Sequence, residues 1–145
     1  MIRFITAEEV LPVRNAVLRE GKNLKDDECR FPTDNAAGNF HLGYYIKGEL
    51  ASIASFHPQS YGQFSGNGYQ VRGVATIAKY QGQGVGSQLL NFAIVYLQGQ
   101  KGNYIWCNGR KKAVKFYQGV GFEIVSPEFE IPGTGPHHVL YVKIQ

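Results

Sequence analysis

A turn with glycine at alternate positions, Gly82, Gly84 and Gly86, is the feature that most constrains this chain. It joins residues 69–77, which alternate as a strand does, to residues 85–98, whose apolar side chains recur at helical spacing. A helix that begins directly after such a turn presents N–H groups without acceptors and a partial positive charge. Because glycines also let the backbone approach a ligand closely, the sequence predicts an anion site, most naturally for phosphate.

Two common phosphate-binding motifs do not match this turn. The dinucleotide motif G-x-G-x-x-G needs an acidic residue about 20 residues later. Here the third glycine comes one place early, and the first acid after the turn is Glu123. The Walker A motif, G-x-x-x-x-G-K-[ST], is absent from the chain. The turn is therefore typical neither of a dinucleotide enzyme nor of an NTPase.

Charge is distributed unevenly along the 145 residues. The formal net charge is only +4, yet residues 50–122 contain seven bases and no carboxylate. Five of these bases lie close together in the sequence: Lys101, Arg110, Lys111, Lys112 and Lys115. Cations near the turn would help to recruit a phosphate-bearing ligand, and a solvated helix face is the alternative interpretation.

Composition and patterning exclude several classes of protein. The first residues lack the apolar region of a secretory signal, and no apolar run reaches the roughly 18 residues of a membrane span. An aromatic content of 13% argues against a disordered basic tail. Cys29, Cys107 and the four histidines have no zinc-ligand spacing, so we expect no metal, and Cys107 is interpreted as a core residue. We expect a cytoplasmic protein with reduced cysteines and no membrane partner.

The pattern of apolar residues predicts an α/β fold with a mixed sheet, as one domain over residues 1–145, in the order β-α-β-β-β-α-β-α-β-β. The predicted strands are 3–6, 40–47, 50–56, 69–77, 103–108, 122–129 and 139–144, and the predicted helices are 6–19, 85–98 and 110–118. Thr6 opens a capping box, and Pro12 predicts a kink or a late start of the first helix. Gly48 and Glu49 form the predicted hairpin turn.

Two segments of the chain resemble a known family. Residues 81–86 read Gln-Gly-Gln-Gly-Val-Gly, and residues 113–122 read Ala-Val-Lys-Phe-Tyr-Gln-Gly-Val-Gly-Phe. They are similar to the Q/R-x-x-G-x-G/A pyrophosphate loop and the A-x-x-F-Y-x-x-x-G-F segment of the GNAT superfamily of acetyl-CoA-dependent N-acetyltransferases. The predicted order of elements resembles the GNAT fold over the whole chain, and most of all the small single-domain bacterial members.

The resemblance implies acetyl-CoA as cosubstrate and a role for individual residues. The backbone of Val74, Ala75 and Thr76 would pair with the pantetheine arm. The pyrophosphate would bind the backbone N–H groups of Gln81, Gly82, Gln83, Gly84, Val85, Gly86 and Ser87. Tyr117 would protonate the leaving thiolate, for which a tyrosine with a pKa of about 10 is in the right protonation state. Asn108 would contact the cofactor from a shifted position, because Arg110 stands where the family usually has asparagine.

The general base remains open at this point. Many members of the family place a Glu or Asp on the strand before the loop, but residues 50–122 contain no carboxylate. The candidates from elsewhere in the chain, none of which we assign, are His41, His57, His137, His138, Asp26, Asp27, Glu28 and Asp34.

The predicted function is transfer of an acetyl group from acetyl-CoA to a primary amine of a small molecule or peptide by direct attack. One alternative is a non-catalytic acyl-CoA-binding module, and a less favoured one is a basic nucleic-acid-binding domain. The expected partner is the amine acceptor, with a homodimer as one option for assembly and no nucleic acid.

Overall fold

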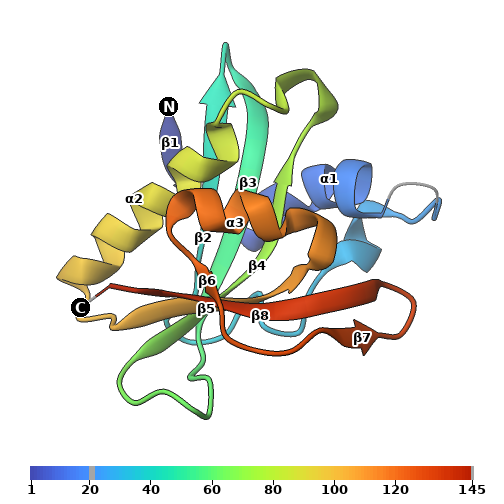
Figure 1. Ribbon diagram of the computed structural model, residues 1–145. Helices are drawn as coiled ribbons and strands as arrows, with labels where there is room; N and C mark the ends of the chain where they lie inside the picture. The colour runs from blue at the N-terminus through green and yellow to red at the C-terminus, as the bar shows by residue number, and fades with distance from the viewer. Residues whose placement is uncertain (20–21, 145) are drawn as a thin grey trace. The chain divides into compact units, whose positions relative to one another are not determined.

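The computed structural model describes residues 1–19 and 22–144 (Figure 1). These residues cluster into two compact units. The first unit contains residues 1–58 and 71–90, and the second contains residues 59–70 and the segment from Asn91 onward. Strand β4 (Gly68–Thr76) and helix α2 (Val85–Gly99) contribute residues to both units. The single domain over residues 1–145 stays a prediction.

The sheet of the first unit contains three antiparallel strands, β1 (Ile2–Ile5), β2 (Phe40–Ile46) and β3 (Glu49–Pro58). Part of β4 lies next to β3 in this sheet. The β2–β3 turn consists of Lys47 and Gly48, with φ of 50° and 79°, and Ile46 pairs with Glu49. The turn predicted at Gly48 and Glu49 is therefore wrong by one residue. A two-residue turn of this kind needs positive φ at both central positions, and Lys47 adopts it.

Helix α1 (Ala7–Val13) begins with the predicted capping box. The Thr6 hydroxyl accepts the Glu9 N–H at 3.2 Å, and the Glu9 carboxylate accepts the Thr6 N–H at 3.0 Å. The predicted helix does not continue as an α-helix to residue 19, because the π-helix η1 (Arg14–Leu18) follows directly. Pro12 lies inside α1 and lacks the N–H that would bond to the preceding turn, which agrees with a change of winding here.

The core of the first unit lies between α1, the loop after it and the sheet. Its buried residues are Val10, Leu11, Val13, Cys29, Ile53 and Ala75. The loop contains one short 3-10 helix, η2 (Asp26–Cys29), and it brings Cys29 to this core.

The sheet of the second unit centres on two long strands, β5 (Tyr104–Arg110) and β8 (Gly135–Lys143), which are antiparallel. β5 is parallel to the first residues of β4, while β8 also pairs with β6 (Glu123–Ile124) and β7 (Phe129–Ile131). The single strand predicted over residues 122–129 is thus wrong, since β6 and β7 are separate. Pro127 lies between them and has no N–H to donate to a ladder.

The remaining helices are η3 (Ala78–Tyr80), η4 (Lys111–Ala113) and α3 (Val114–Val120). α3 ends at Gly121, whose φ of 106° is left-handed. None of the helices in the described ranges is long and apolar enough to cross a membrane.

Candidate functional site

The glycine turn leads into α2 as predicted. Gly82 and Gly84 have φ of 79° and 78°, a conformation that side chains disfavour, and a Cβ added to either would meet no atom within 4 Å. The Gln88 N–H donates to the Gly84 carbonyl at 3.1 Å, which opens the helix. The N–H groups of residues 85–87 therefore have no acceptor earlier in the helix. Exposed glycine backbone and these donors together fit a phosphate group.

The predicted pantetheine segment, Val74–Thr76, ends β4 in the same unit. The Ser52 hydroxyl donates to the Ala75 carbonyl at 3.0 Å and lies 2.9 Å from the Thr76 hydroxyl. The Gln81 side-chain amide donates to the Thr76 carbonyl at 2.9 Å, so it links the strand to the glycine turn. Just before this segment, Gly73 has φ of 63°, and a Cβ there would lie 3.0 Å from the Phe31 ring.

Tyr117 lies on α3 in the second unit and is only 8% exposed. Its ring contacts Phe116 and Phe122, with centroids 5.1 and 5.3 Å away, and packs against the backbone of Gly109. Burial raises the pKa of Tyr117 well above 10, and its hydrogen-bonding neighbour Cys107 raises it further. The Tyr117 hydroxyl is therefore protonated at neutral pH, as a general acid must be before it reacts.

Cys107 and Asn108 are neighbours on β5. Cys107 is 1% exposed, and burial raises the pKa of its thiol to about 12, although hydrogen bonds with Tyr117 and the Leu140 backbone act in the opposite direction. A thiol of this kind is a poor nucleophile, and the interpretation of Cys107 as a core residue is confirmed. Asn108 is exposed and pairs with Val139 inside the strand rather than at its predicted end.

The predicted site residues thus fall into two groups. Val74–Thr76 and Gln81–Ser87 belong to the first unit, whereas Asn108 and Tyr117 belong to the second. The first group is joined by the hydrogen bond of Gln81, and the second by the packing of α3 on β5.

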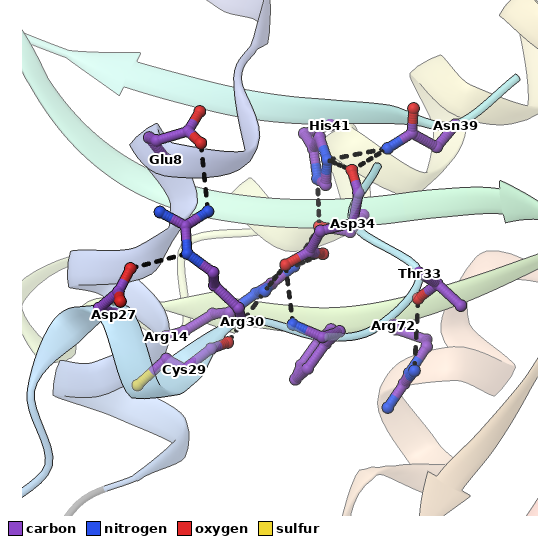
Figure 2. Close-up of polar contacts among 12 residues, drawn as sticks. Glu8, Arg14, Asp27, Cys29, Arg30, Thr33, Asp34, Asn39, His41 and Arg72 are labelled. Atoms are coloured by element: carbon purple, nitrogen blue, oxygen red, sulfur yellow. Dashed lines mark hydrogen bonds and ion pairs between the residues drawn. The ribbon is translucent and has the colours of Figure 1, made fainter. Parts of the chain in front are cut away.

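Asp34, a candidate general base, is tied into a buried ion pair (Figure 2). Its carboxylate accepts hydrogen bonds from both terminal nitrogens of Arg14, at 2.7 and 2.8 Å, and from the Phe31 N–H at 2.8 Å. Burial acts to raise the pKa of Asp34, but the hydrogen bonds from Arg14 and Phe31 outweigh it and lower the pKa overall. A carboxylate held in this way is a weak base.

The other loop acids and three of the candidate histidines also make structural contacts. Asp27 pairs with Arg30, the Glu28 carboxylate accepts the Lys25 N–H, and Asp26 accepts from Asn15. The ring nitrogens of His41 lie 2.7 Å from the Ser55 hydroxyl and 3.0 Å from the Asp34 carbonyl, and Asn39 contacts both His41 and Asp34 (Figure 2). His137 and His138 lie within hydrogen-bond distance of the backbone oxygens of Gly135 and Ser126.

Arg14 is a buried base that the sequence patterns did not single out. It is fully buried and donates not only to Asp34 but also to the Cys29 carbonyl at 3.0 Å and the Ser55 hydroxyl at 2.9 Å. The sequence does contain a signal for its burial: Arg14 follows Val10 by four residues and so shares the apolar face of the first helix. A base on such a face needs a buried acidic partner.

Comparison with known proteins decides the family. The model of the acetyltransferase (GNAT) family matches residues 8–122. The chain belongs to this family. A curated relative, the uncharacterized N-acetyltransferase YitI of Bacillus subtilis (strain 168), is 35% identical over 141 residues, which cover 97% of this chain and 93% of YitI.

Solved structures show the same fold at low identity. Escherichia coli ElaA has a TM-score of 0.77 at 18% identity, covering 97% of this chain and 98% of ElaA. An aminoglycoside 6'-N-acetyltransferase complexed with coenzyme A has a TM-score of 0.76 at 13% identity, covering 100% of this chain and 97% of that one. The predicted GNAT fold, the class of N-acetyltransferase and the cosubstrate acetyl-CoA are confirmed.

Proposed function

We propose that this GNAT enzyme transfers the acetyl group of acetyl-CoA directly to a primary amine of a small molecule or peptide, with Tyr117 as general acid. The protonated Tyr117 hydroxyl, buried beside Cys107, is the observation that carries the proposal. As the amine nitrogen bonds to the acetyl carbon and the C–S bond breaks, the Tyr117 proton goes to the leaving sulfur. The nitrogen loses its extra proton to solvent, and the tyrosinate takes one back.

The cosubstrate would be held mainly by backbone. The N–H groups of residues 81–87 would bind its pyrophosphate, a role supported by the open space at Gly82 and Gly84 and by the donors at the start of α2. The backbone of residues 74–76 would pair with the pantetheine arm, and Asn108 would add a side-chain contact.

Thiol release from acetyl-CoA in the presence of a panel of primary amines tests the proposed function. Tyr117→Phe removes the hydroxyl and keeps the ring, so we expect kcat to fall by about 10²–10⁴. The Kd for acetyl-CoA should stay within about threefold, because the hydroxyl acts on the leaving group rather than on binding.

Tyr141→Phe is the matched control, since Tyr141 is a half-buried tyrosine of the same unit whose ring stacks on Phe64. It should leave kcat unchanged. Unchanged kcat in Tyr117→Phe, with chemistry shown to be rate-limiting, contradicts the role of Tyr117. Acetyl-CoA binding without thiol release by any amine would instead favour a binding module.

A further inference from the structure

Arg72 on β4 is a half-buried base with no carboxylate at ion-pair distance in the described part of its unit. Its hydrogen bond to the Thr33 hydroxyl is long, at 3.4 Å (Figure 2). A guanidinium group carries five N–H donors. Among the described acids, Asp34 is the one whose charge acts on Arg72, and both oxygens of that carboxylate are already bound by Arg14.

Phe31 fixes the position of the Arg72 side chain without neutralising it. The central guanidinium carbons of Arg14 and Arg72 lie 3.8 and 4.4 Å from the centroid of this one ring. Cation–π contacts of this kind restrain a guanidinium group but leave its charge in place. The Phe31 ring therefore holds the guanidinium group of Arg72 in place beside the buried guanidinium group of Arg14.

Among the described residues around Arg72, positive charge is in excess. Burial lowers the pKa of Arg72, the charges of Arg14 and Arg19 lower it further, and Asp34 opposes them. These four groups comprise three bases and one acid, which leaves two positive charges without a counterion among them. An anionic ligand would relieve this repulsion, whereas a cationic one would increase it.

We infer that Arg72 binds a carboxylate or phosphate group on the acetyl acceptor, so that the substrate class is anionic amines. This rests on the proposed function, in which residues 74–76 hold the pantetheine arm. Arg72 precedes Val74 by two residues with Gly73 between them, so the backbone distance is at most about 7 Å. The two ends of one small molecule can span this distance, and the planar guanidinium fork suits the two oxygens of such a group.

The first test uses the unaltered protein and acceptors matched in pairs. Glycine is compared with glycinamide, L-alanine with L-alaninamide, and O-phosphoethanolamine with ethanolamine, in the thiol-release assay with acetyl-CoA. We expect kcat/KM to be about 10- to 100-fold higher for the anionic member of at least one pair, the range of one charged hydrogen bond. Removing the carboxylate lowers the amine pKa of an amino acid, so intrinsic reactivity favours the amides and cannot explain the expected result.

The second test asks whether Arg72 causes the preference. Arg72→Gln should abolish it by raising KM for the anionic member by about 10- to 100-fold, with little change for the neutral member or for acetyl-CoA. Arg72→Lys, which keeps the charge and loses the fork, should retain part of it. Arg3→Gln is the matched control, because Arg3 also lies over an aromatic ring, that of Tyr45, but is exposed.

The outcomes separate this inference from the proposed function. Thiol release with equal or better use of the neutral member in every pair overturns the inference alone. An anionic preference that persists in a folded Arg72→Gln variant, checked by circular dichroism and acetyl-CoA binding, also overturns it. No thiol release with any primary amine overturns the proposed function and the inference together. If Arg72→Gln does not fold, the paired comparison on the unaltered protein decides.

Discussion

Asp34→Asn tests how far the first unit depends on one buried ion pair. The substitution keeps the shape of the side chain but removes the charge that faces both terminal nitrogens of Arg14, at 2.7 and 2.8 Å. Arg14 is fully buried and cannot lose its proton, so it would remain as an uncompensated charge. Removing one partner of such a pair costs about 3–5 kcal/mol of the free energy of unfolding.

That loss is large against the total stability of about 5–15 kcal/mol expected for a native domain. At about 2–4 °C per kcal/mol for a protein near this size, the Tm should fall by roughly 6–20 °C. Urea unfolding followed by circular dichroism measures the free energy directly. The double variant Arg14→Met/Asp34→Leu should recover much of the free energy of unfolding that Asp34→Asn loses, because apolar residues of similar size can replace a buried ion pair.

Asp27→Asn is the control for this prediction. Asp27 also accepts a 2.7 Å hydrogen bond from an arginine, Arg30, but its side chain is 80% exposed. We expect its unfolding midpoint to match that of the unaltered protein. Equal midpoints for Asp34→Asn and Asp27→Asn would refute the reasoning that burial makes the Asp34 pair important.

The pH dependence of this effect has a defined sign. Because the folded protein lowers the pKa of Asp34 from its ordinary value of 3.8, the stabilisation is present above that value and is lost as pH falls through the folded pKa. The difference in stability between the unaltered protein and Asp34→Asn should be constant near neutral pH and narrow below about pH 4. A difference that widens in acid contradicts this.

Three other measurements address the glycines and the cysteine. Gly84→Val puts a β-branched side chain at a φ of 78°, so it should lower the unfolding midpoint even though an added Cβ meets nothing within 4 Å, and in the folded variant it should weaken acetyl-CoA binding at least about tenfold; retained affinity argues against a phosphate-binding turn. Gly73→Ala should destabilise the protein more than Gly48→Ala, because both have positive φ but only Gly73 has the Phe31 ring 3.0 Å from an added Cβ; equal midpoints contradict this. The Cys107 thiol, with a pKa of about 12, should resist iodoacetamide at pH 8 until urea unfolds the chain, and rapid labelling of the folded protein argues against its burial.

Features that depend on adjacent residues could be predicted from the sequence. The capping box needs only Thr6 and Glu9, and the glycine turn needs only its own residues and the helix after it. The errors arose where two local preferences compete. A turn at Lys47 and Gly48 competed with one a residue later, and Pro127 interrupted a segment that is otherwise strand-like. Each error is local and leaves the α/β class unchanged.

The polar network around Arg14 could not be predicted in the same way. Its acceptors Asp34 and Ser55 lie 20 and 41 residues away in the sequence, so only the folded chain brings them together. The sequence shows that Arg14 shares an apolar helix face and therefore needs a partner, but several loop acids were available for that role. The same holds for Arg72, whose contact with Phe31 depends on the path of the loop that follows the first helix.

The acid-free segment of residues 50–122 consequently contains two kinds of positive charge. Lys79 and Lys111 pair with acids from outside the segment, Glu49 and Glu128, at 2.9 and 3.0 Å, and all four side chains are at least 45% exposed. Water and salt screen such charges and each of the two lysines has an acid beside it, so these pairs contribute little to selectivity. Arg72 differs because the fold has already removed much of its water and holds its side chain on an aromatic ring. A fixed and partly dehydrated guanidinium group gains most from one anion at one position, which is why we connect Arg72 with the choice of acceptor.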